Sequence, residues 1–208
     1  MLLIAPASQG ITSILEQADE IAATKIDVTP IIGHATRSSV LAALRQRRYD
    51  IWYFVTHGGP EGIQLDDQIM PAEELIAAAR SNARSAPGDL LSGQRPLQCI
   101  FINTCSSASI IDRLTEAAPI AAIGTYGEVD ELTAFSVGIQ WAVNVSDGIG
   151  YEEAINLARH PGIQHIYKAH HDAPQGRRGT RHSTIIILAG LGLTAAMLTV
   201  TSRQSQEA

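Results

Sequence analysis

The stretch "DIWYFVTHGGPEG", residues 50–62, decides the fold class of this chain. A run of β-branched and aromatic residues, typical of a strand, ends abruptly at His57, and two glycines follow. A second stretch, "LQCIFINTCSSAS" (residues 97–109), repeats the arrangement: an apolar run ends at Cys105, and small polar residues follow. We interpret both runs as buried strands that end at a chemically reactive residue.

Strand and helix patterns alternate along the chain around these two runs. Strands are expected at 1–7, 26–32, 50–56, 97–104 and 119–126, and a small hairpin at 62–70. Helices are expected at 10–24, 38–47, 71–80, 107–117, 130–145 and 151–159. Because strands that alternate with helices form a mostly parallel sheet with helices on both faces, the sequence predicts an α/β fold.

The composition narrows the range of functions. A formal net charge of -6 argues against a nucleic-acid partner, because no basic face is available for phosphates. The chain has two cysteines, which does not indicate a disulfide scaffold, and Cys99 lies mid-strand, where we expect it to pack in the core. The histidines other than His57 lack ligand-like partners, and "HGGPEG" does not precede a helix as a phosphate-binding loop would. We therefore expect neither a metal nor a cofactor.

The C-terminal segment predicts a membrane anchor. Residues 184–200 carry no charge, and as a helix they would span about 25 Å, close to the ~30 Å of a bilayer core. A core helix is the alternative, but the segment has no polar stripe to support it. Three arginines precede the segment and one follows it, which predicts a cytoplasmic catalytic domain. The expected organisation is a domain at 1–165, a polar linker at 166–183, a transmembrane helix at 184–201 and a short tail at 202–208.

His57 and Cys105 indicate a nucleophilic site. In a parallel sheet both would project from the edge where ligands bind. An imidazole can activate a thiol and then protonate a leaving amine, and the bare backbone at Gly58 can donate to an oxyanion. Ser106 and Ser107 are expected to cap the following helix. Alone, each residue is more often a turn histidine or a buried cysteine. Together, 48 residues apart, they match the interval between the histidine and the cysteine of caspases.

The motifs also resemble those of a known family. "DIWYFVTHGGPEGIQLDD", "LQCIFINTCSSAS" and "PIAAIGTYGEVDELTAFSVGIQWAV", with the helices after it, resemble the CHAT family of caspase-like peptidases, relatives of separase, over roughly residues 1–160. The resemblance implies a caspase-like three-layer α/β/α sandwich and a role in bacterial defence or programmed cell death. It implies a Cys105 nucleophile, a His57 acid/base, and oxyanion donors from the Gly58 and Cys105 amides.

These observations lead to one functional expectation and one alternative. The expectation is a membrane-anchored cysteine endopeptidase that acts on a protein or peptide substrate. By analogy with separase, Asp130 or Glu131 would hold an arginine before the cleaved bond, although for one of the two a helix-capping role is expected. The alternative is a catalytically inactive, membrane-tethered interaction module of the same fold. The sequence does not decide whether the chain forms a homo-oligomer or requires an activating partner.

Overall fold

A six-stranded sheet forms the centre of the molecule. The computed structural model describes residues 1–6, 14–46, 49–84, 94–159 and 166–171 of the 208. The sheet has the order β2-β1-β3-β7-β8-β9 and is built from β1 (Leu2–Ala5), β2 (Thr29–Ile32), β3 (Ile51–Val55), β7 (Cys99–Asn103), β8 (Ala121–Thr125) and β9 (Tyr167–His171). The first five of these strands run parallel, and β9 pairs antiparallel with β8. The predicted, mostly parallel sheet is confirmed.

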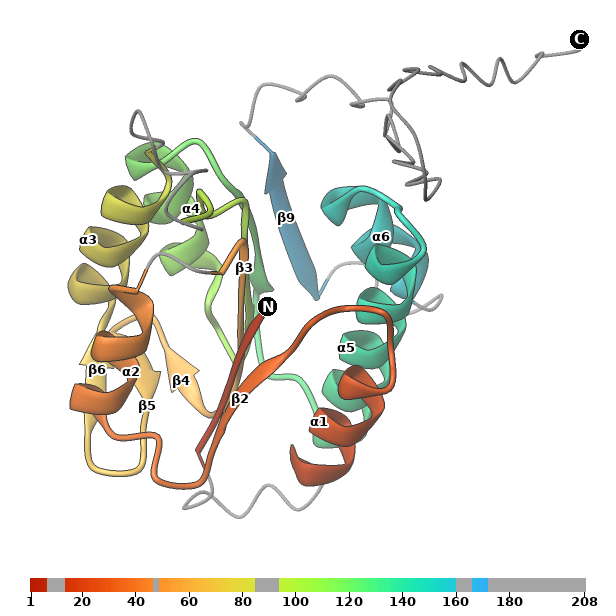
Figure 1. The fold of residues 1–208 in the computed structure, drawn as a ribbon, viewed down its shortest axis with the longest axis horizontal. Helices are drawn as coiled ribbons and strands as arrows, with labels where there is room; N and C mark the ends of the chain where they lie inside the picture. Colours follow the sequence, from red (N-terminus) through yellow and green to blue (C-terminus); the bar gives the residue numbers. More distant parts are fainter. Residues whose placement is uncertain (7–13, 47–48, 85–93, 160–165, 172–208) are drawn as a thin grey trace, which may run out of the picture. The chain divides into compact units, whose positions relative to one another are not determined.

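Helices cover both faces of the sheet, which gives three layers (Figure 1). One face carries α1 (Ile14–Ala22), α5 (Glu131–Ser146) and α6 (Tyr151–Ala158), and the other carries α2 (Arg37–Leu44), α3 (Ala72–Asn82) and α4 (Ala108–Ala117). The central strands are buried along their whole length, and their alternate side chains enter two separate cores. Trp52 and Phe54 lie in the core under α2–α4, whereas Tyr53 and Phe101 pack with Trp141 under α5.

A small antiparallel sheet follows β3. Its order is β4-β5-β6, from β4 (Gly58–Gly59), β5 (Gly62–Gln64) and β6 (Ile69–Pro71). The predicted hairpin is therefore confirmed as β5 and β6, and β4 adds a strand that the glycines hide in the sequence. This sheet lies near the lower end of Figure 1, next to the point where β3 ends.

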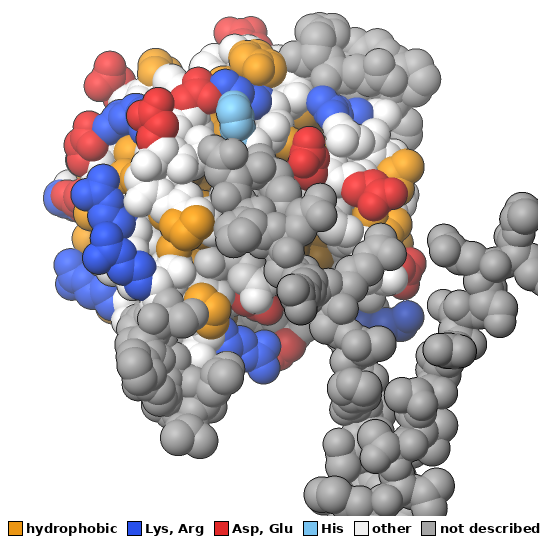
Figure 2. Space-filling view, turned by 90° about the horizontal axis from the view of Figure 1, so that it is seen from above, with side chains coloured by type: hydrophobic (Ala, Val, Ile, Leu, Met, Phe, Trp, Pro, Cys, Tyr) orange, Lys and Arg blue, Asp and Glu red, His pale blue; other side chains and the backbone are white. Residues whose placement is uncertain are grey.

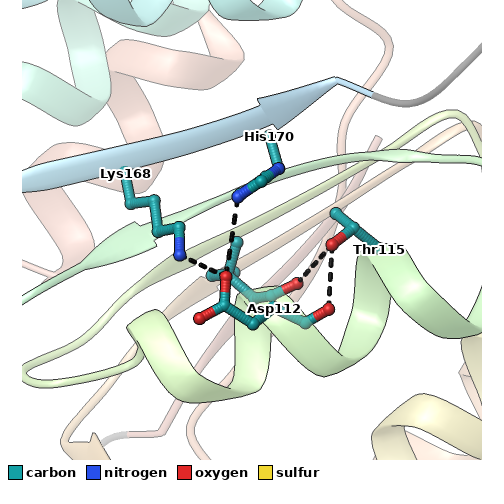
Figure 3. A network of polar contacts seen from close by, with 5 residues as sticks. Asp112, Thr115, Lys168 and His170 are labelled. Atoms are coloured by element: carbon teal, nitrogen blue, oxygen red, sulfur yellow. Dashed lines mark hydrogen bonds and ion pairs between the residues drawn. The ribbon is translucent and has the colours of Figure 1, made fainter.

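The prediction that the linker begins at residue 166 is wrong for residues 167–171. These residues form β9, which belongs to the same compact unit as the rest of the sheet. Its sequence "YKAHH" lacks an apolar run because β9 is an edge strand. Lys168 and His170 face Asp112 of α4, with 3.6 Å between His170 Nε2 and Asp112 Oδ1 (Figure 3). The two polar side chains therefore dock the strand instead of marking a loop.

The surface and the C-terminal segment complete the description. On the face shown in Figure 2, acidic and basic side chains are interspersed, and hydrophobic side chains are scattered among them. None of the described helices combines the length and the hydropathy that a membrane span requires. The predicted transmembrane helix at 184–201 lies outside the described residues, as do the rest of the linker and the tail.

Candidate active site

His57 and Cys105 meet at the carboxyl ends of two neighbouring strands. β3 and β7 pair in parallel, with Val55 opposite Asn103. His57 and Cys105 stand two residues beyond these paired strand ends. Both line one pocket of about 130 Å³, in which His57 is exposed and Cys105 is partly buried. The structure thus places in one pocket the two candidate residues that lie 48 residues apart in the sequence.

Gly58 begins β4 directly beside the cysteine segment. A Cβ at this position would lie 3.0 Å from Thr104 Oγ1 and 3.0 Å from the carbonyl oxygen of Gly62. Glycine therefore lets the backbone of β4 approach Gly62 of β5 and Thr104 closely. The Gln64 amide donates to the His57 carbonyl at 2.9 Å. Because hydrogen-bonded and non-hydrogen-bonded pairs alternate in an antiparallel ladder, the Gly58–Ile63 pair is non-hydrogen-bonded. The N–H of Gly58 therefore points away from β5.

The turn that carries Cys105 is held by the loop after β8. Ser106 adopts a left-handed conformation, with φ of 51°, which is strained for a residue with a side chain. Its amide donates to the Gly127 carbonyl at 2.9 Å, and the Cys105 thiol donates to the Val129 carbonyl at 3.8 Å. Two consecutive donors of this turn thus contact two carbonyls of one short loop, and Val129 also lines the pocket.

The predicted side-chain cap of α4 is absent at Ser107. Ser107 stands at the N-cap position, but its side chain makes no capping hydrogen bond. Its buried hydroxyl instead contacts the Ile102 and Thr104 carbonyls at 3.2 and 3.3 Å and accepts from the Thr125 amide at 2.9 Å. The hydroxyl therefore ties the end of β7 to β8 instead of capping the helix.

The two acidic candidates are separated by the structure. Asp130 is the N-cap of α5, and its carboxylate accepts from the amide and the hydroxyl of Thr133 at 2.9 and 2.6 Å. These hydrogen bonds hold the pKa of Asp130 below its ordinary value. Glu131, in contrast, lines the pocket with His57 and Cys105. The expected capping role thus belongs to Asp130, and the pocket carboxylate is Glu131.

Two amide side chains of the pocket wall, Gln17 of α1 and Asn103 of β7, were not predicted from the sequence. Both are almost completely buried, at 2% and 3% exposure. The signal for Asn103 was available, because a polar residue in phase with Cys99 and Phe101 must face the core. Gln17 gave a similar signal, since it lies within an amphipathic helix beside the buried Ala18.

The search for metal ligands and the comparisons with known proteins give no further information on the chemistry of the pocket. Within the described part of the chain, no three His, Cys, Asp or Glu side chains converge as metal ligands. No protein-family model matches the chain, and no curated protein sequence matches it significantly. The chemistry of the site therefore has to be argued from its own residues.

Proposed function

We propose that the chain is a cysteine endopeptidase of the caspase-like type, with Cys105 as nucleophile and His57 as acid/base. One observation carries the proposal: the two residues stand at corresponding positions beyond a paired strand end and line a single pocket. The mostly parallel three-layer fold and the resemblance of residues 1–160 to the CHAT family support it.

The reaction requires two steps. The Cys105 sulfur, having lost its proton to His57, attacks the carbonyl carbon of the scissile peptide and forms a tetrahedral oxyanion. The C–N bond then breaks, His57 returns the proton to the leaving amine, and a thioester remains on Cys105. Water, deprotonated by His57, hydrolyses the thioester and restores the thiol. The outward-directed N–H of Gly58 is the donor that we assign to the oxyanion, since β5 does not use it.

Glu131 leads us to propose cleavage after a basic residue. A carboxylate at the pocket wall pairs with a guanidinium through two directed hydrogen bonds, whereas it repels an acidic side chain. The proposed substrate is therefore a protein or peptide with arginine, or less readily lysine, before the cut. The membrane anchor at 184–201, with the catalytic domain on the cytoplasmic side, remains part of the proposal on the strength of the sequence alone.

The test is covalent labelling followed by peptide cleavage. An electrophilic peptide probe ending in arginine should label Cys105 in the native chain, and heat denaturation should abolish the labelling. Cys105→Ala should eliminate cleavage, and His57→Ala should lower kcat by about 10²- to 10⁴-fold.

Cys99 provides a matched control on the same strand. Cys99 is fully buried, and burial raises the pKa of its thiol, so it has no reactive thiolate. Cys99→Ala should retain cleavage and labelling. If the native chain is neither labelled at Cys105 nor active on any peptide of a positional library, the inactive interaction module is the better description.

A further inference from the structure

A buried polar network lies directly behind the pocket, with the amide of Asn103 at its centre. Its Nδ2 donates to the Tyr53 hydroxyl at 3.1 Å and to the Ala134 carbonyl of α5 at 2.8 Å. Its Oδ1 accepts from the Tyr167 hydroxyl at 2.9 Å. Gln17 adds a 3.1 Å hydrogen bond to Tyr53. The network therefore joins α1, β3, β7 and β9 to the first turns of α5.

The Ala134 carbonyl fixes how this network is oriented. A carbonyl only accepts, so the Asn103 atom beside it must be the nitrogen. Oδ1 then faces Tyr167, whose hydroxyl must donate. If this donor were removed, Oδ1 would lose its hydrogen bond in the buried core, and only the two hydrogen bonds donated by Nδ2 would hold the amide. The hydroxyl on β9 thus strengthens the link between β7 and α5.

β9 holds this hydroxyl in place from both faces of the sheet. On one face, Lys168 and His170 contact Asp112 of α4 (Figure 3). On the other face, Tyr167 is 2% exposed and packs with its ring edge-on to Phe101, at 6.1 Å between centroids. The Ile166 carbonyl just before the strand also accepts from the Tyr126 amide at 2.7 Å, where the loop beside Cys105 begins. The hydroxyl therefore has little freedom to move.

We propose that Tyr167 and Asn103 are positioning residues, which fix the strand end that carries Cys105 against the helix start that carries Glu131. The inference rests on the proposed function for its catalytic consequence, although the positioning itself does not. Asn103 stands two residues before Cys105, and Ala134 stands three residues after Glu131, so the Asn103–Ala134 hydrogen bond spans the pocket wall. Misplacement of either side by about 1 Å would disturb the geometry of attack.

Two arguments favour this role over simple core packing. An unpaired polar group in the core lowers the free energy of unfolding, and apolar residues of similar size would fill the same space without that cost. Burial also raises the pKa of Tyr167, with smaller contributions from Tyr53, Asp130 and Cys105. The hydroxyl consequently keeps its proton, and remains a donor to Asn103, across the pH range in which a thiol and an imidazole work.

The test compares Tyr167→Phe with Tyr151→Phe in the full chain. Tyr151 is a matched control because its hydroxyl also makes one side-chain hydrogen bond, to Gln98 at 3.1 Å, and its ring also packs on an aromatic neighbour. Tyr167→Phe should speed amide hydrogen exchange in peptides covering 104–106 and 131–138 by about three- to tenfold. It should also lower kcat by about tenfold or more while KM changes less than twofold. Tyr151→Phe should leave the exchange of these peptides and kcat unchanged.

The two readouts separate the possible failures. If exchange at 104–106 and 131–138 is the same in both variants, the positioning role is wrong, whatever the activity. If exchange rises in Tyr167→Phe but the native chain cleaves no peptide, the positioning role stands and the proposed function fails. If exchange rises and kcat is unchanged, the pocket tolerates the displacement and the catalytic part of the inference is overturned.

Discussion

Replacement of Gly138 by alanine tests the core behind the candidate site. In an ordinary helix this change stabilises by about 1 kcal/mol, because alanine has the higher helix propensity. Here the new Cβ would lie 1.9 Å from the Tyr53 hydroxyl and 2.4 Å from Gln17 Nε2. Tyr53 is fully buried against Phe101 and Trp141, with 4.8 and 5.8 Å between ring centroids, so it has little room to retreat.

The expected cost follows from these contacts. Overpacking of a core costs about 1–3 kcal/mol, and the displaced hydroxyl loses two hydrogen bonds of about 1 kcal/mol each. After subtraction of the helix-propensity gain, Gly138→Ala should lower the free energy of unfolding by about 2–4 kcal/mol. Urea denaturation followed by tryptophan fluorescence would measure this change, since Trp141 lies in the affected core.

Two companion variants make the result interpretable. A Cβ at Gly59 would meet nothing within 4 Å, so Gly59→Ala should change the stability by less than about 0.5 kcal/mol. Tyr53→Phe removes the atom that the new methyl group meets, so its combination with Gly138→Ala should cost less than the sum of the two single changes. A Gly138→Ala protein as stable as the native chain would refute the close approach of α5 to Tyr53.

Three further predictions follow from the site and the C-terminal segment. Glu131→Gln should abolish the preference for arginine in a positional peptide library, whereas Asp130→Ala should keep the preference and lower stability by about 1 kcal/mol at neutral pH. Because the folded-state pKa of Asp130 is lowered, its contribution is present above the ordinary value of 3.8 and is lost as pH falls through the folded pKa, so the stability difference should narrow in acid. Ser106→Val should be less stable than Ser106→Gly by about 1–2 kcal/mol in thermal unfolding, because the left-handed turn excludes β-branched residues; equal stabilities would contradict the strain. The full chain should pellet with membranes and resist alkaline wash, while a chain ending at Gly179 should stay in the supernatant; two soluble forms would disprove the anchor.

The central strands could be predicted because their burial leaves a direct mark on the sequence. β3 and β7 are buried at every position, so each is an uninterrupted apolar run, and parallel pairing then places His57 and Cys105 on one edge. β9 left no such mark. It is an edge strand whose polar side chains bind Asp112, and its charged and histidine residues look like a linker.

The detailed contacts of the site could not be read from the sequence for a different reason. Ser107 looks like a helix cap, but its hydroxyl binds two carbonyls just before it in the chain and the Thr125 amide of β8 instead. Asp130 and Glu131 are adjacent acidic residues, and only the start of α5 decides which of them caps the helix and which lines the pocket. Such choices depend on tertiary neighbours, which local sequence patterns do not encode.

The turn around Cys105 bears on the choice between the proposed enzyme and the inactive module. Ser106 holds a conformation that costs about 1–2 kcal/mol, and strain of this kind persists only where the surrounding structure enforces it. Here hydrogen bonds hold the segment on both sides of Ser106. The Ser107 hydroxyl contacts the Thr104 carbonyl, and the Ser106 amide and the Cys105 thiol contact the Gly127 and Val129 carbonyls. Just before the turn, the Asn103 side chain contacts the Ala134 carbonyl. An interaction module that used another surface would gain nothing from holding this turn in a strained conformation. The proposed nucleophile would have to meet a carbonyl carbon at a defined angle, which requires such fixation, and its proposed partner His57 stands at the matching position beyond the neighbouring strand.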